Sequence, residues 1–86
     1  MKKIKLIRAI KDAAGIEDIN EINIKEENEI TAYDLYDVEF DSGGKIKFGT
    51  MAPAIANMCN LTEAQVASMS PKDFAQLSAE VGKYIE

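Results

Sequence analysis

Residues 60–74, NLTEAQVASMSPKDF, predict two helix starts eight residues apart. Thr62 is a suitable N-cap with Gln65 at the third helical position, and the two form a capping box. Ser70 repeats the pattern, with a proline at the first helical position and Asp73 at the third. A short helix that begins after Thr62 must therefore end before Ser70, where a longer helix follows. We expect a compact, angled pair of helices.

The spacing of apolar residues predicts helices on both sides of this segment. Residues 51–59 have a proline in the first turn and four apolar side chains on one face: Met51, Ile55, Met58 and Cys59. The helix expected over residues 71–85 carries an apolar stripe at three-to-four-residue spacing: Phe74, Leu77, Val81 and Tyr84. Gly82 inside that helix costs about 1 kcal/mol relative to alanine, which indicates a close backbone contact there.

The N-terminal half alternates as strands do. Residues 3–6, KIKL, and 21–25, EINIK, each alternate polar and apolar side chains, and Gly15 lies between them. The isoleucines at positions 4, 7 and 10 also fit a helical face, so the first segment is ambiguous, although its β-branched residues favour a hairpin with a long connection. Residues 38–48, VEFDSGGKIKF, predict a second hairpin around a DSGG turn.

Together these elements predict one α+β domain over residues 1–86. Between the two hairpins, Thr31 and Asp34 have the spacing of a capped helical turn. We expect N-terminal β-hairpins packed with a C-terminal bundle of about three short helices, with residues 1–48 mainly extended and residues 49–86 helical. A chain of this length buries roughly 60% of the surface that its unfolded form exposes, so association with another chain is a common supplement.

The charge distribution excludes one class of partner. Residues 1–11 hold five basic residues and no acid, whereas residues 12–41 hold eleven acids and one lysine. A net charge of −5 with a single arginine lacks the basic footprint that nucleic-acid binding requires. We expect the basic segment to pair with the acidic middle of the chain; binding of an acidic partner is the alternative.

Composition also bears on the compartment. The chain has no apolar run near the 18 residues that a membrane-spanning helix needs. Its basic start lacks the uninterrupted apolar region of a signal peptide, so we expect none. The single cysteine allows no disulfide framework, and the cytoplasm is the expected location.

The residues that catalysis and metal binding usually require are missing. The chain has no histidine, the usual general base and metal ligand. Cys59 therefore has no histidine to activate it, and it shares an apolar face with Met58, so we expect it in the core. Residues 37–48 space their acids as a calcium loop does, but Ser42 and Phe48 occupy the positions that need glycine and glutamate. The sequence predicts a non-enzymatic protein without cofactor or metal.

Interaction with another protein remains as the function. Three methionines lie in the helical half, at positions 51, 58 and 69. Methionine suits surfaces that adapt to varied apolar partners, and the alternative is that these side chains fill a small core. The apolar stripe of the last helix is open to the same two interpretations, core or interface. A long stripe on a small domain also predicts self-association.

Two segments carry a resemblance to a known family. Residues 16–35, IEDINEINIKEENEITAYDL, match a strand and a following threonine-alanine-glycine-aspartate-leucine element at Thr31, Ala32, Asp34 and Leu35, with Tyr33 in place of glycine. Residues 55–85 match a helix, turn and helix at Leu61, Val66, Met69, Asp73, Phe74, Leu77 and Val81. On these residues the chain resembles the small tail assembly chaperones of long-tailed bacteriophages and prophages, of the Mu-like kind. Residues 37–48 depart from the family, because they look more like a hairpin than its usual middle segment.

The resemblance implies a non-enzymatic assembly factor. Such chaperones bind the long, hydrophobic tape measure protein in the host cytoplasm and keep it soluble until tail tube subunits replace them. They are usually absent from the finished virion. The candidate residues for binding an apolar helical segment of that partner are Met58, Met69, Phe74, Leu77, Val81 and Tyr84. The alternative function is a small dimerising interaction or regulatory adaptor unconnected with phage tails.

Overall fold

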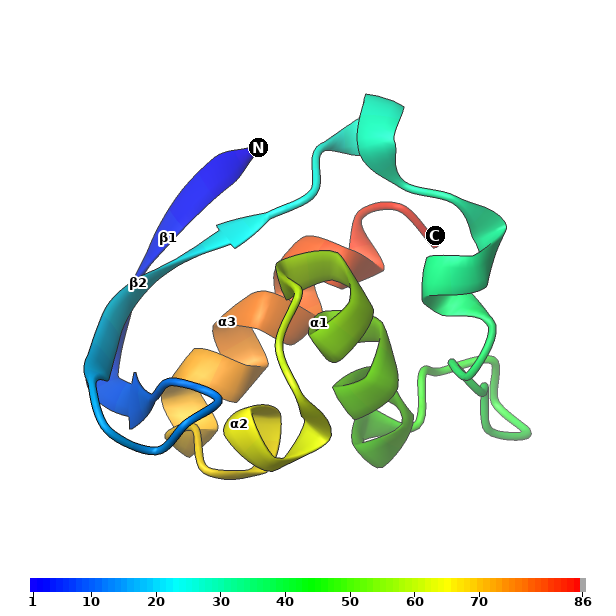
Figure 1. The fold of residues 1–86 in the computed structure, drawn as a ribbon. Helices are drawn as coiled ribbons and strands as arrows, with labels where there is room; N and C mark the ends of the chain where they lie inside the picture. The colour runs from blue at the N-terminus through cyan, green and yellow to red at the C-terminus, as the bar shows by residue number, and fades with distance from the viewer. Residues whose placement is uncertain (86) are drawn as a thin grey trace.

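The fold is α+β, as predicted. The computed structural model describes residues 1–85. Two strands come first, β1 (Lys2–Lys11) and β2 (Asp18–Ile24). Three short 3₁₀ turns follow, η1 (Glu27–Glu29), η2 (Ala32–Leu35) and η3 (Phe48–Thr50), and then three helices, α1 (Met51–Cys59), α2 (Glu63–Ala67) and α3 (Pro71–Gly82). In Figure 1 the hairpin curves along one side of the three helices, and η1 and η2 lie beyond its end, beside α1.

The first predicted hairpin is confirmed. β1 pairs with β2 in antiparallel register, with Ile4 opposite Ile22, and the register shifts between Lys5 and Ile10. The connection needs Gly15, whose φ of +75° is a backbone conformation that L-residues rarely adopt. The ambiguity of the first segment is thus resolved in favour of the strand, because β2 supplies a partner for its backbone groups.

Both predicted helix starts are also confirmed. The Thr62 hydroxyl accepts a hydrogen bond from the Gln65 N–H at 3.1 Å, and the Gln65 side chain accepts one from the Thr62 N–H at 2.8 Å. The Ser70 hydroxyl accepts one from the Asp73 N–H at 3.1 Å. The last helix is shorter than expected, because α3 ends at Gly82 and residues 83–85 form turns. Glycine is a poor helix former, which accounts for an end at this position.

The second predicted hairpin forms only its turn. Phe40 and Ile46 make a single antiparallel bridge, and no strand forms on either side of it. The Asp41 carboxylate accepts hydrogen bonds from the N–H groups of Gly43 and Lys45, so the turn is satisfied locally. Val38 and Ile46 pack against the core, whereas Phe40 is 48% exposed, and an isolated two-stranded ribbon is at best marginally stable in water. The chain turns instead into η3, at Phe48.

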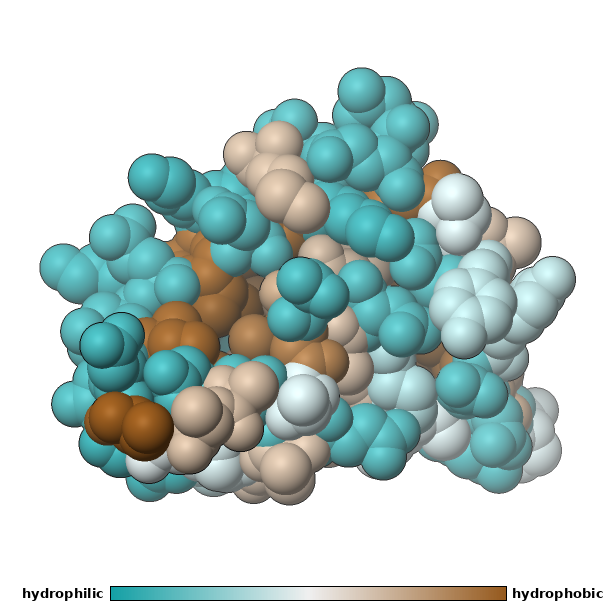
Figure 2. All heavy atoms as spheres, viewed as in Figure 1, coloured by the Kyte–Doolittle hydropathy of each residue, from teal (hydrophilic) through white to brown (hydrophobic). Residues whose placement is uncertain are grey.

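The core lies between the hairpin and the helices. The hairpin contributes five buried side chains: Ile4, Leu6, Ile10, Ile22 and Ile24. The helices and their connections contribute ten: Met51, Ala54, Ile55, Ala56, Met58, Cys59, Val66, Met69, Leu77 and Val81. Figure 2 shows hydrophobic side chains between the hairpin and the helices, on a face that is otherwise largely hydrophilic. The methionines at positions 51, 58 and 69 therefore belong to the core.

Two lysines of the basic N-terminal segment pair with different parts of the chain. Lys11 contacts Asp18 at 2.6 Å, as the acidic middle predicted, but Lys2 contacts Glu80 of α3 at 3.1 Å. Both pairs are at least half exposed on the lysine side, so each contributes little to stability. Within residues 1–85, no helix has the length and apolar character needed to cross a membrane.

Candidate functional site: an apolar groove along α3

The fold divides the six predicted partner-binding residues into two groups. Four lie in the core, since Met58, Leu77 and Val81 are 0% exposed and Met69 is 5% exposed. These side chains cannot touch a partner while the domain keeps this packing. The other two, Phe74 and Tyr84, reach the surface, at different places along α3 and the segment that follows it.

Phe74 lies near one end of an apolar groove. One wall comes from the middle of the chain, and the other is the solvent-facing side of α3. The groove is lined by Ile46, Phe48, Met51, Ser78, Ala79, Gly82 and Lys83 and has a volume of about 360 Å³. We call it the α3 groove. Lys83 supplies the only charged side chain among these residues, so the lining is predominantly apolar.

An aromatic pair joins the two walls. The rings of Phe48 and Phe74 meet edge to face, with centroids 4.7 Å apart. Such pairs contribute about 0.5–1.5 kcal/mol beyond the area that they bury. Phe48 is nevertheless 59% exposed, so a large part of its ring reaches the surface beside the groove. Its exposed face is available to a partner without rearrangement of the core.

The α3 wall is made of small side chains. An added Cβ at Gly82 would meet no atom within 4 Å, so the close backbone contact predicted for this residue is wrong. The space beside Gly82 is part of the groove instead. The Ser78 hydroxyl is buried and has no hydrogen-bond partner among residues 1–85. Small residues along a helix allow another backbone to approach closely.

Asp73 fixes α3 against the hairpin. Its carboxylate accepts hydrogen bonds from the Ile7 N–H at 2.9 Å and the Arg8 N–H at 3.1 Å, where the strand register shifts, and from the Ser70 hydroxyl at 2.9 Å. Burial by itself raises the pKa of Asp73, but these hydrogen bonds outweigh it, so the pKa lies below the ordinary value. The carboxylate therefore stays ionised and holds the start of α3 in place.

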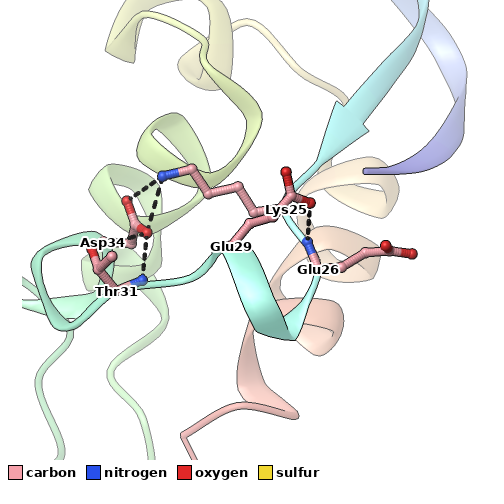
Figure 3. Close-up of polar contacts among 5 residues, drawn as sticks. All are labelled: Lys25, Glu26, Glu29, Thr31 and Asp34. Atoms are coloured by element: carbon pink, nitrogen blue, oxygen red, sulfur yellow. Dashed lines mark hydrogen bonds and ion pairs between the residues drawn. The ribbon is translucent and has the colours of Figure 1, made fainter.

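Asp34 fixes η2 in a similar way, on the far side of α1. Figure 3 shows its carboxylate between the Lys25 ammonium, at 3.0 and 3.1 Å, and the Thr31 N–H, at 3.0 Å. Burial acts to raise the pKa of Asp34, and the contacts with Thr31 and Lys25 outweigh it, so its pKa is also lowered. A neighbouring contact in Figure 3, from the Glu26 N–H to the Glu29 carboxylate at 3.1 Å, closes η1.

The structure assigns Cys59 to the core. The side chain is 6% exposed, and burial raises the pKa of its thiol to about 12. A thiol with so high a pKa is not ionised at neutral pH and is not a nucleophile. Within residues 1–85, no three histidine, cysteine or acidic side chains are grouped so that they could hold a metal ion. Cys59 is therefore a core residue, as the sequence predicts.

Sequence reasoning missed the middle-segment wall of the α3 groove. Ile46 and Phe48 were interpreted as one arm of a hairpin, and Ala79 lies on the polar side of the expected stripe. Residues 45–48, KIKF, alternate polar and apolar side chains as a strand does, so the sequence alone did not separate a groove wall from a hairpin arm. Tyr84 borders a different hollow, with Ile30 and Leu35, and does not join the α3 groove.

Comparison with protein families gives one match, over residues 3–85, to the family described as phage tail assembly chaperone proteins, E, or 41 or 14. The match extends over nearly the whole chain, including both predicted caps and all residues of the α3 groove. No curated protein and no solved structure matches the chain.

Proposed function

We propose that this chain, which belongs to the phage tail assembly chaperone family, binds an apolar helical segment of the tape measure protein and keeps that protein soluble during tail morphogenesis. Family membership gives the role in tail assembly. The partner, the mode of binding and the location in the host cytoplasm are our proposal.

The exposed Phe48 beside a groove of small side chains is the observation that carries the proposal. An amphipathic helix binds a groove through apolar side chains spaced three to four residues apart. The α3 groove is open, apolar and bordered by Phe48 and Phe74, which are held together by their ring contact. We therefore assign Phe74, among the residues predicted from sequence, to partner binding, and we assign Met58, Met69, Leu77 and Val81 to the core that supports the groove.

Coexpression with the tape measure protein encoded in the same tail gene cluster tests the proposal. The wild-type chain should keep that protein in the soluble fraction and copurify with it. Phe48→Asp should abolish both, because a carboxylate in the groove would have to be desolvated against an apolar helix. The variant itself should lose about 1 kcal/mol or less, since Phe48 is 59% exposed, and circular dichroism with thermal melting would show this.

A matched control separates the groove from general surface hydrophobicity. Ile16 is 75% exposed in the hairpin connection, so Ile16→Asp makes the same kind of change away from the groove. Solubilisation should survive in this variant. Ala79→Glu, on the opposite wall, should fail as Phe48→Asp does. If Phe48→Asp and Ala79→Glu both solubilise the partner as well as wild type, the α3 groove is not the binding surface.

Self-association belongs to the same proposal. A homo-oligomer would cover part of the exposed apolar surface until the tape measure protein replaces the second copy. Light scattering that finds only monomer at high micromolar concentration would contradict this. The alternative, a dimerising adaptor unconnected with tails, would be favoured if the gene lies outside a tail cluster and the tape measure protein fails to copurify.

A further inference from the structure

A second hollow lies between η2 and the helices α1 and α2, away from the α3 groove. It has a volume of about 490 Å³, and its lining includes Tyr33, Tyr36, Asp37, Ala56, Leu61 and Glu63. We call it the tyrosine hollow. Figure 1 shows η2 beside α1, on the side of the molecule opposite the hairpin. None of these residues belongs to the lining of the α3 groove.

Two exposed aromatic rings form its outer wall. Tyr33 is 69% exposed and Tyr36 is 73% exposed, and their rings meet edge to face with centroids 5.9 Å apart. The turn that carries them, η2, is held in place, because Asp34 between the two tyrosines is buried and bound to Lys25. Aromatic side chains on a fixed turn lose little conformational entropy when a partner binds.

The charge of the tyrosine hollow has one sign. Asp37 and Glu63 are exposed, and neither forms an ion pair or a side-chain hydrogen bond with another group of residues 1–85. No lysine or arginine is among the residues that line the hollow. Lys25, which reaches η2 from the end of β2, is already paired with Asp34. Two unpaired carboxylates beside two tyrosine rings favour a cationic ligand. Carboxylates attract a cation by their charge, and aromatic faces attract it by their quadrupole.

We propose that the tyrosine hollow is a second docking surface, which binds a polypeptide segment whose lysine or arginine side chains alternate with small apolar ones. The cationic groups would contact Asp37 and Glu63 and lie over the tyrosine rings. The apolar side chains would pack on Ala56 and Leu61, at the base of the hollow. This surface goes beyond the proposed function, since it differs from the α3 groove in residues, charge and the chemistry of its ligand.

The test uses the full chain and two synthetic helical peptides with the same leucine and alanine positions. One peptide carries lysine and arginine at its polar positions, and the other carries glutamate. The basic peptide should bind, more weakly as salt is added, and NMR amide shifts should concentrate at Tyr33, Tyr36 and Glu63. The double variant Asp37→Lys with Glu63→Lys should weaken binding by about tenfold or more, because it replaces attraction with repulsion.

Two further variants keep the result interpretable. Glu17→Lys with Glu21→Lys makes the same change in net charge at two exposed hairpin residues and should bind the basic peptide as wild type does. Tyr33→Ala with Tyr36→Ala removes the rings without changing charge and should also weaken binding. Circular dichroism should show both tyrosine-hollow variants folded, since all four side chains are exposed.

Three outcomes would overturn the proposal. The first is equal binding of the acidic and basic peptides. The second is unchanged binding by the lysine and alanine variants of the hollow. The third is a set of amide shifts confined to the α3 groove. A failure here leaves the tape measure proposal intact, because Phe48→Asp tests that function at a different surface.

Discussion

Two capped turns of this protein share one sequence pattern but differ in the groups that their aspartate binds. Thr31 with Asp34, and Ser70 with Asp73, each place a hydroxyl residue three positions before an aspartate. Both aspartates are buried, at 3% and 1% exposure. The Asp34 carboxylate accepts from the ammonium of Lys25, just after β2, and from the Thr31 N–H of its own turn, whereas the Asp73 carboxylate accepts from two backbone N–H groups in the middle of β1.

Because their partners differ, the two aspartates should contribute differently to the stability of the fold. A lysine that loses its carboxylate can turn toward water, and the Lys25 side chain is already 28% exposed. The N–H groups of Ile7 and Arg8 cannot move away without distorting the strand. They would be left without a protein acceptor at a part-buried site, and a donor left unpaired there costs up to about 1–3 kcal/mol. The same local pattern therefore gives a contact at Asp34 whose loss water can partly compensate, and a contact at Asp73 on which the stability of the fold depends more strongly.

A third cap fits the same interpretation. Gln65 forms a capping box with Thr62 and also donates from its side chain to the Lys11 carbonyl at 3.0 Å. In these three caps, the residue at the third helical position also binds the hairpin or the residue that follows it. The caps at Thr62 and Ser70 thus fasten the C-terminal half to the hairpin, and the cap at Thr31 fastens η2 to the end of β2.

The largest expected effect is that of Asp73→Ala. The change removes the helix cap partner and leaves two N–H groups of β1 without an acceptor, so we expect a loss of about 3 kcal/mol in the free energy of unfolding. Urea denaturation followed by circular dichroism measures it. Asp37→Ala, at an exposed aspartate, is the control and should stay within about 0.5 kcal/mol of wild type. A loss below about 1 kcal/mol for Asp73→Ala would remove the distinction between the two turns.

Asp34→Ala should cost less, about 1.5 kcal/mol, because Lys25 can be hydrated once its partner is gone. A double-mutant cycle with Lys25→Met isolates the ion pair, and the coupling free energy should be about 1 kcal/mol. Equal losses for Asp34→Ala and Asp73→Ala would show that backbone and lysine partners are equivalent here, contrary to the argument above.

The smallest expected effect is on the acid dependence of stability. The pKa values of Asp34 and Asp73 are both lowered by folding, so their contributions are fully present above the unfolded value of about 3.9 and are lost as the pH falls through the folded values. Stability should therefore decline below about pH 5. Urea midpoints measured from pH 7 to pH 3 should fall less steeply for Asp73→Asn than for wild type. An unchanged slope would mean that the carboxylate is not held ionised by the fold.

Local patterns in the sequence were sufficient to place both helix starts and the two strands, but not the end of α3. The caps at Thr62 and Ser70 and the alternation around Ile4 and Ile22 gave helices and strands where the structure has them, because caps and side-chain periods act over a few residues. The local range of these signals also explains why the hairpin predicted for residues 38–48 forms only in part. A turn signal is local and gives the turn, but how far the pairing extends depends on the rest of the fold: Val38 and Ile46 pack against the core, and the pairing stops at the Phe40–Ile46 bridge.

The sequence by itself determined that this is a small α+β protein with capped helices, without the residues that catalysis usually requires, and similar to the tail assembly chaperones. Only the tertiary structure decided which apolar side chains are core and which are surface. Leu77 and Phe74 belong to one stripe, yet Leu77 is fully buried while Phe74 meets Phe48 beside a groove. It also decided that Asp73 binds Ile7, 66 residues earlier. Helical spacing fixes the face on which a side chain lies, but the elements that pack against that face come from distant parts of the chain, and their positions are set by the burial of the whole core.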